Sequence, residues 1–302
     1  MAVRDYGSAG ACDHTVLLLH GLCLTQASWA AQIRQLQRRW GNTIRIITYD
    51  HRGHGRSTGA PMRTYRIDRL AADLAEVLTA LHVEGPLTLA GHSMGGMTAL
   101  AYLGRPTADR PVEPQGLVLI ATAAGRIAER GIGRLLATPA TRMLFELVHH
   151  MPGGAAEKAI KALIRPMCEA ITRYPGEASA ERNALAAVAA GAVSSTPLTT
   201  AAGFLPSLKH FDQYQTIASI TANTVIVSGG ADVLTPASHA HDLLAAIPGA
   251  THVHRPAAGH MLLQEAPHCV STAIDCAMGM HRRDCPECRR SARRPSMSAH
   301  CA

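Results

Sequence analysis

The chain has 302 residues, enough for one large α/β domain that carries an inserted segment. Hydrophobic residues make up 47% of it and charged residues 17%, as in an ordinary globular protein, and no stretch approaches the roughly 20 apolar residues of a membrane-spanning helix. The net charge of +7 is accompanied by only 2 Trp, 6 Tyr and 3 Phe, so we expect no nucleic-acid partner and no stable membrane insertion.

Along the chain, apolar runs typical of buried strands alternate with helical patterns. Residues 1–14 contain one arginine and no apolar run, unlike a secretory signal, and we therefore expect a cytoplasmic protein. The alternation predicts an α/β fold, a mostly parallel sheet flanked by helices. Between residues 67 and 81, apolar side chains repeat at three- and four-residue steps, which predicts a helix. The six predicted strands are residues 15–19, 45–49, 86–90, 116–120, 224–228 and 251–254.

This alternation stops after the fourth predicted strand. Residues 124–205 are rich in Ala and Arg, and Gly and Pro divide their helical patterns into short segments. We therefore predict a core formed by residues 1–123 and 206–280, with an inserted helical cap at 124–205 that covers the strand ends. Residues 281–302 contain six arginines and are predicted to be a basic, disordered tail.

The tail contains Cys285 and Cys288, and their spacing is that of half a zinc site. Three interpretations stay open: a structural metal site completed by other His or Cys residues of the tail, a redox dithiol, and a solvated tail without either. The solvated tail is favoured, because half a site is weak evidence. We therefore predict no metal and no cofactor.

The stretch GHSMGG at residues 91–96 lies between a predicted strand and a helix-favouring segment. A serine on such a sharp strand-to-helix turn takes strained backbone angles and presents its hydroxyl outward. The chain can fold back without collision only if the residues two before and two after are small, as Gly91 and Gly95 are. Ser93 is therefore a candidate nucleophile, although a Gly-x-Ser-x-Gly pattern alone also occurs by chance.

A serine hydroxyl becomes a good nucleophile when a base removes its proton and an acid orients that base. Asp232 and His260 follow the last two predicted strands, each in a loop. The carboxyl ends of parallel strands lie at one edge of a sheet, where open α/β sheets gather their active sites. The sequence therefore predicts that Ser93, Asp232 and His260 lie together.

The sequence contains five motifs in a characteristic order: 20–21 (HG), 50–57 (DHRGHGRS), 91–96 (GHSMGG), 230–232 (GAD) and 259–261 (GHM). Through these motifs it resembles the α/β-hydrolase superfamily, over about residues 15–280. The resemblance implies the α/β-hydrolase fold, with Ser93 as nucleophile, His260 as general base and acid, and Asp232 as the acid that orients His260. It also implies an oxyanion hole formed by the backbone N–H groups of Leu22 and Met94.

Each residue has a simpler alternative. Asp232 is also a favourable helix cap, but residues 121–124, the other position at which relatives carry the acid, hold no carboxylate. His252 and His254 are alternative bases, but both fall inside a predicted strand, whereas His260 lies in the expected Gly-His loop. The segment 50–57 is interpreted as structural.

The resemblance and the serine together predict the type of reaction. Epoxide hydrolases and haloalkane dehalogenases of this superfamily carry Asp in place of the serine, which argues against both. We predict a serine esterase that cleaves a carboxylic ester through an acyl-enzyme, with a small-molecule, lipase-like substrate such as a monoacylglycerol. The alternatives are a thioesterase, a cofactor-free haloperoxidase or perhydrolase, a C–C bond hydrolase, and a non-catalytic small-molecule binder on the same fold. The sequence leaves the oligomeric state open.

Overall fold

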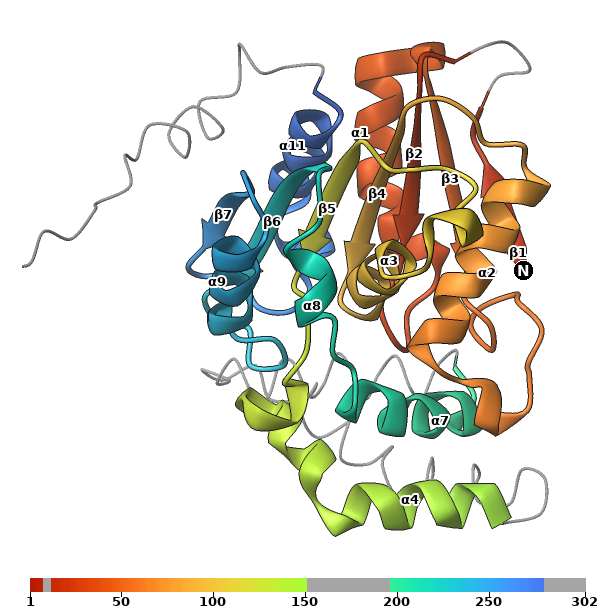
Figure 1. Cartoon of the computed structure of the whole chain (residues 1–302), viewed down its shortest axis with the longest axis vertical. Helices are drawn as coiled ribbons and strands as arrows, with labels where there is room; N and C mark the ends of the chain where they lie inside the picture. Colours follow the sequence, from red (N-terminus) through yellow and green to blue (C-terminus); the bar gives the residue numbers. More distant parts are fainter. Residues whose placement is uncertain (8–11, 151–195, 280–302) are drawn as a thin grey trace, which may run out of the picture.

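The computed structural model describes residues 1–7, 12–150 and 196–279 (Figure 1). In this part of the chain, seven strands form one sheet in the order β1-β3-β2-β4-β5-β6-β7, parallel throughout except for the antiparallel pair β1 and β3. The predicted mostly parallel sheet is confirmed. The strands are β1 (Ala2–Asp5), β2 (His14–Leu19), β3 (Ile44–Asp50), β4 (Leu87–His92), β5 (Gly116–Ile120), β6 (Asn223–Gly229) and β7 (Thr251–Arg255).

Strand β1 is not among the six strands predicted from apolar runs. It has four residues, two of them partly buried and two exposed, and it lies at the edge of the sheet. Such a short edge strand carries little hydrophobic pattern, because only its pairing with β3 defines it.

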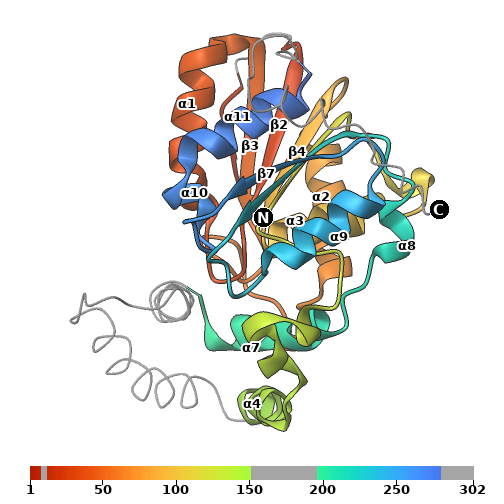
Figure 2. The same cartoon turned by 90° about the vertical axis from the view of Figure 1, so that its left-hand side faces the viewer.

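Helices cover both faces of the sheet, as Figure 2 shows. Alternate residues of each strand point to opposite faces, so Leu17 and Leu19 pack in one core while Val16 and Leu18 pack in the other. The first core includes side chains of α2, α3, α8 and α9, and the second includes those of α1, α10 and α11. These helices are α1 (Ala30–Trp40), α2 (Ile67–Ala80), α3 (Met94–Leu103), α8 (Tyr214–Ile217), α9 (Ala237–Ala246), α10 (Leu262–Glu265) and α11 (Pro267–Ala277).

Two further helices, α4 (Pro139–His150) and α7 (Leu198–Lys209), lie beyond one end of the sheet and contact each other (Figure 1). The chain reaches them from β5 through the short 3-10 helices η5 (Ile127–Glu129) and η6 (Gly131–Ala137). Part of the predicted cap, and the predicted tail with Cys285 and Cys288, lie outside the described residues. Helix α7 runs through the predicted boundary at residue 205, and the division into core and cap stays a prediction. None of the described helices is both long and apolar enough to cross a membrane.

The loop at residues 50–57 is fixed to α2 by a buried ion pair. The guanidinium of Arg52 donates two hydrogen bonds of 2.6 Å to the carboxylate of Asp73, whose side chain is fully buried. Arg69 approaches the same carboxylate at 3.3 Å, from a position that is nearly half exposed. The loop also wraps around Asp50, which accepts the backbone N–H of Arg56. These contacts agree with the structural role interpreted from the sequence.

We expect Arg52→Met to lower the free energy of unfolding by about 3 kcal/mol, because it leaves the buried carboxylate of Asp73 with only the more distant Arg69. Urea unfolding followed by circular dichroism measures this. The matched control is Arg66→Met, which breaks an exposed pair with Asp68 and should leave stability nearly unchanged. If the two substitutions lower the free energy of unfolding equally, burial does not make the pair of Arg52 and Asp73 more important than the exposed pair.

Candidate active site

Ser93 stands on a strained turn between β4 and α3. Its backbone angles are φ 52° and ψ −118°, a region that residues other than glycine seldom occupy. The turn is held from both sides: the N–H of Ser93 donates to the carbonyl of Ile120 (2.9 Å), and its own carbonyl accepts from the hydroxyl of Thr122 (2.8 Å). The surrounding fold therefore fixes the backbone of this serine.

The glycines of the turn are required by close backbone contacts. A Cβ on Gly95 would collide with the carbonyl group of Leu19 in β2, and a Cβ on Gly91 would collide with the backbone of Gly95. Helix α3 therefore begins directly against the sheet. This agrees with the reason for which the sequence analysis selected these two positions.

The structure brings the three predicted catalytic side chains together. The Nε2 atom of His260 lies 3.0 Å from Oγ of Ser93, and its Nδ1 atom lies 2.9 Å from Oδ2 of Asp232. Asp232 and His260 occupy the loops after β6 and β7, and both are buried. The alternative bases His252 and His254 instead hydrogen-bond to the hydroxyl of Ser228. The arrangement is that of a nucleophile, a base and an orienting acid.

Asp232 is held as an acceptor by four donors. Its Oδ1 accepts the backbone N–H groups of Leu234 and Thr235, both at 2.9 Å, while its Oδ2 accepts the Thr235 hydroxyl at 2.7 Å in addition to His260. Burial alone would raise the pKa of Asp232, but His260 and the bonds from Thr235 outweigh it and lower the pKa. Asp232 is therefore ionised at neutral pH. Nδ1 of His260 carries the proton, which leaves Nε2 free to accept from Ser93.

Thr235 was not singled out from the sequence. Its hydroxyl also lies 3.3 Å from Nδ1 of His260, so it contacts both partners of the acid–base pair. The only sequence signal for it is its position three residues after Asp232 and directly before Pro236, the residue that precedes α9.

The predicted oxyanion groups lie on either side of Ser93. Met94 is the first residue of α3, so its N–H has no partner within the helix. Leu22 follows Gly21, and a Cβ on Gly21 would lie 3.2 Å from Cβ of Ser93. In the described part of the chain, neither N–H donates to a backbone acceptor. Both groups are therefore unengaged next to the serine, while their role in catalysis stays a prediction.

A cavity of about 250 Å³ opens on Ser93 and His260. Among the described residues that line it, none is charged. Its apolar wall comes from the loop after β2, from α3, η5, η6 and α7, and from the loops after β6 and β7. The wall consists of Leu22, Leu24, Met94, Met97, Ile127, Ile132, Leu135, Leu136, Leu205, Leu208, Leu234 and Met261.

Residues 14–267 match the model of the alpha/beta hydrolase fold family. The chain belongs to this family. It is 30% identical, over 251 residues, to a protein of Klebsiella pneumoniae (strain 342) named "Putative carbamate hydrolase RutD", and the match covers 81% of this chain and 84% of that relative. The solved structures that resemble it include a thermophilic esterase from Thermogutta terrifontis (TM-score 0.68, 24% identity, 92% of this chain and 93% of that one). An enol-lactonase from Burkholderia xenovorans LB400 is similar (TM-score 0.67, 21% identity, 92% and 95%).

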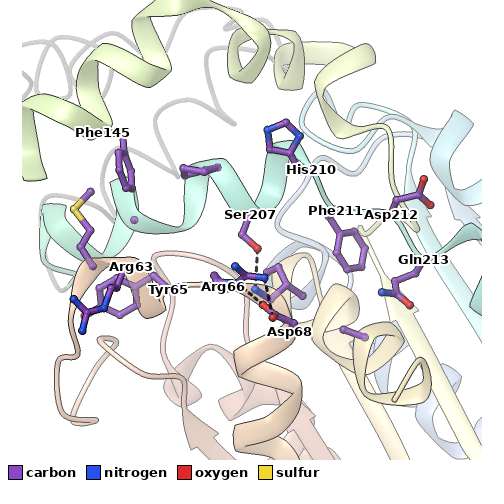
Figure 3. A pocket seen from close by; sticks show the side chains of 15 residues that line it. Arg63, Tyr65, Arg66, Asp68, Phe145, Ser207, His210, Phe211, Asp212 and Gln213 are labelled. Atoms are coloured by element: carbon purple, nitrogen blue, oxygen red, sulfur yellow. Dashed lines mark hydrogen bonds and ion pairs between the residues drawn. The ribbon is translucent and has the colours of Figure 1, made fainter. Parts of the chain in front are cut away.

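A second and larger hollow in this alpha/beta hydrolase, of about 530 Å³, lies on the other side of α7 (Figure 3). Leu205 and Leu208 of α7 line the cavity at Ser93, whereas Pro206 and His210 line this hollow. Arginine and aspartate side chains lie on the wall of this hollow, and none of the three predicted catalytic residues borders it. Helix α7 therefore lies between the apolar cavity at Ser93 and a hollow with charged side chains on its wall.

Cys23 also lines the cavity at Ser93, and its thiol is a second potential nucleophile there. Burial raises the pKa of its thiol to about 12. Because the thiolate is the reactive form, this cysteine is protonated and unreactive at neutral pH. Within the described residues, no group of three or more His, Cys, Asp or Glu side chains is placed to hold a metal ion.

Three buried histidines surround the site and hydrogen-bond only to the main chain. Burial lowers the pKa of His20 and His92 to about 3 and that of His54 to about 4. Nε2 of His92 lies 2.9 Å from the carbonyl oxygen of His260, which can only accept, so this nitrogen is the donor. The bond joins the turn that carries the serine to the loop that carries the predicted base.

The neutral histidines predict sensitivity to acid. Below about pH 6.5 the unfolded chain binds protons at these rings, whereas the folded chain does not bind them until about pH 4 or lower. The contribution of the neutral rings to the free energy of unfolding is therefore fully present above about pH 6.5 and decreases as the pH falls. Each ring contributes a slope of up to about 1.4 kcal/mol per pH unit in that window. Urea unfolding at pH 7.5, 6.5, 5.5 and 4.5 measures the total, and His54→Gln should flatten the slope. A free energy of unfolding that stays constant between about pH 7 and 5 would refute the predicted sensitivity to acid.

Proposed function

We propose that this alpha/beta hydrolase is a serine esterase that cleaves small carboxylic esters whose acyl group is apolar and uncharged. The observation that carries the proposal is the cavity at Ser93, because its described lining combines a nucleophile and base with an apolar wall free of charged side chains. A polar or charged acyl group buried there would lose its water without gaining partners, at a cost of about 2 kcal/mol or more. Apolar acyl chains carry no such cost.

The proposed reaction proceeds through an acyl-enzyme. His260 takes the proton of Ser93 at Nε2 while Oγ attacks the ester carbonyl, and the N–H groups of Leu22 and Met94 stabilise the resulting oxyanion. The same nitrogen then protonates the departing alcohol, and a water molecule, activated by His260, hydrolyses the acyl-enzyme. Asp232 stays ionised and stabilises the imidazolium that forms in each half of the reaction.

The size of the cavity favours short and medium acyl chains. At about 250 Å³ it is smaller than the roughly 300 to 1,000 Å³ of typical sites for drug-sized ligands. We therefore expect butyrate to octanoate esters to be better substrates than palmitate esters. A carbamate, as in the name of the Klebsiella relative, presents an N–H donor to this apolar wall and should be cleaved more slowly.

The test is a series of p-nitrophenyl esters from acetate to palmitate, run beside a matching carbamate and a thioester, with wild type and Ser93→Ala. We expect Ser93→Ala to lower kcat at least a thousandfold, on the order of the loss for other serine nucleophiles, and to abolish labelling by a fluorophosphonate. Ser238→Ala, which changes an exposed serine of α9, is the matched control and should keep both. Labelling that survives in Ser93→Ala would disprove the nucleophile. Binding without turnover would favour the non-catalytic binder, and faster cleavage of the thioester or carbamate would reassign the substrate.

Filling the cavity should change chain-length selectivity. In Leu208→Trp the larger side chain projects from α7 into the apolar space, so kcat/KM for octanoate should fall about tenfold or more, a loss of roughly 1.4 kcal/mol, while acetate is nearly unaffected. His210→Trp, on the other side of the same helix, should leave the profile unchanged. A uniform loss across the series in Leu208→Trp would show that this cavity does not hold the acyl chain.

A further inference from the structure

The loop after β2 carries the N–H of Leu22, and histidine rings hold both its own peptide group and the next one. Nδ1 of His20 lies 2.8 Å from the carbonyl oxygen of Gly21, which belongs to the same peptide unit as the N–H of Leu22. The next N–H along the chain, that of Cys23, lies 3.2 Å from Nε2 of His54. The direction of the Leu22 N–H thus depends on the contact within its own peptide group and on the contact of the peptide group that follows.

The bonding partners fix the proton on His54. A backbone N–H can only donate, so Nε2 is the unprotonated nitrogen that accepts from Cys23. The other nitrogen, Nδ1, lies 3.1 Å from the carbonyl oxygen of Arg52 and carries the proton. Burial keeps the ring neutral by lowering its pKa to about 4. A protonated ring could not accept the bond.

The loop needs such support because its backbone is unfavourable by itself. Cys23 has a φ of 60°, in the left-handed region that residues other than glycine rarely adopt. The support is rigid: the loop of His54 is fixed by the pair between Arg52 and Asp73, and its ring packs against the rings of His20 and Phe204 at centroid distances of 5.2 and 5.8 Å.

We propose that His54 is a positioning residue of the oxyanion hole, which accepts the N–H of Cys23 and thereby holds the N–H of Leu22 toward the oxygen that becomes charged. The proposal rests on the proposed function in that it needs an oxyanion to form beside Ser93. His54 touches neither the substrate nor the triad, and it acts through the loop alone.

The chain supplies a matched control in His51. This ring is also fully buried and lies in the same motif, with its centroid 4.5 Å from that of His20, but neither of its nitrogens accepts the N–H of Leu22 or of Cys23. His51→Leu therefore removes packing without removing an acceptor for these N–H groups, whereas His54→Leu removes packing and the acceptor. In His54→Gln the amide oxygen takes the place of Nε2 and preserves the acceptor.

The experiment measures ester hydrolysis and the affinity for a trifluoromethyl ketone, which forms an oxyanion adduct with a serine. We expect His54→Leu to lower kcat about tenfold to a hundredfold, because a misdirected donor should cost less than the loss of about a hundredfold to a thousandfold known for a missing one. KM should change less than about threefold, and the affinity for the ketone should fall by a factor similar to that of kcat. His54→Gln and His51→Leu should stay within about threefold of wild type. Equal losses in His51→Leu and His54→Leu, a loss in KM alone, or a folded His54→Gln that is as slow as His54→Leu would overturn the proposal.

A second measurement does not depend on turnover. The amide proton of Cys23, followed by NMR, should exchange with solvent at least tenfold faster in His54→Leu than in His51→Leu or His54→Gln. If the Cys23 amide proton exchanges no faster in His54→Leu, the positioning role is overturned, even when the enzyme is active. If the wild type shows no hydrolysis that depends on Ser93, the proposed function is overturned instead. If His54→Leu does not fold, His54→Asn, whose shorter amide cannot reach Cys23, takes its place against His54→Gln.

Discussion

The site depends on one constraint, the close approach of α3 to the sheet at Ser93. Because Gly91 and Gly95 lack side chains, the helix starts in contact with the carbonyl of Leu19, and the backbone of Ser93 takes angles that it would not adopt in a free loop. The cost of this strain is offset by the packing of the parallel strands on either side, whose residues are almost all fully buried. The position of the Ser93 hydroxyl is therefore determined by the core, and the loops that carry Asp232 and His260 are arranged around it.

Histidines contribute to this arrangement in two ways. His260 contacts the serine and Asp232, and its exchange of protons is the proposed chemistry. His20, His54 and His92 are instead kept neutral by burial, and their rings bond to main-chain groups of the loops around the serine. A neutral imidazole has one donor and one acceptor in fixed directions, so it can join two backbone segments without introducing a charge into the core.

The sequence predicted those parts that depend on local pattern. The parallel strands, the helix at 67–81 and the gathering of Ser93, Asp232 and His260 follow from apolar periodicity and from the rule that strand ends meet at one edge. Apolar periodicity did not reveal β1, which only its pairing defines, or the contacts of Thr235 with His260 and of His54 with Cys23, which join distant segments. His54 was included in a motif interpreted as structural, and its link to Cys23 becomes visible only in three dimensions.

The family and the neighbouring structures share the sheet, whereas selectivity is expected to come from what covers it. About half of the apolar wall of the cavity is supplied by η5, η6 and α7, segments inserted between β5 and β6, while Ser93, Asp232 and His260 come from loops of the sheet itself. Substitutions in the inserted segments can therefore change the shape and polarity of the cavity without disturbing the strained turn. Solved structures named as an esterase and as an enol-lactonase share this fold, and a relative in sequence is named as a carbamate hydrolase, so the fold alone does not indicate which group is cleaved.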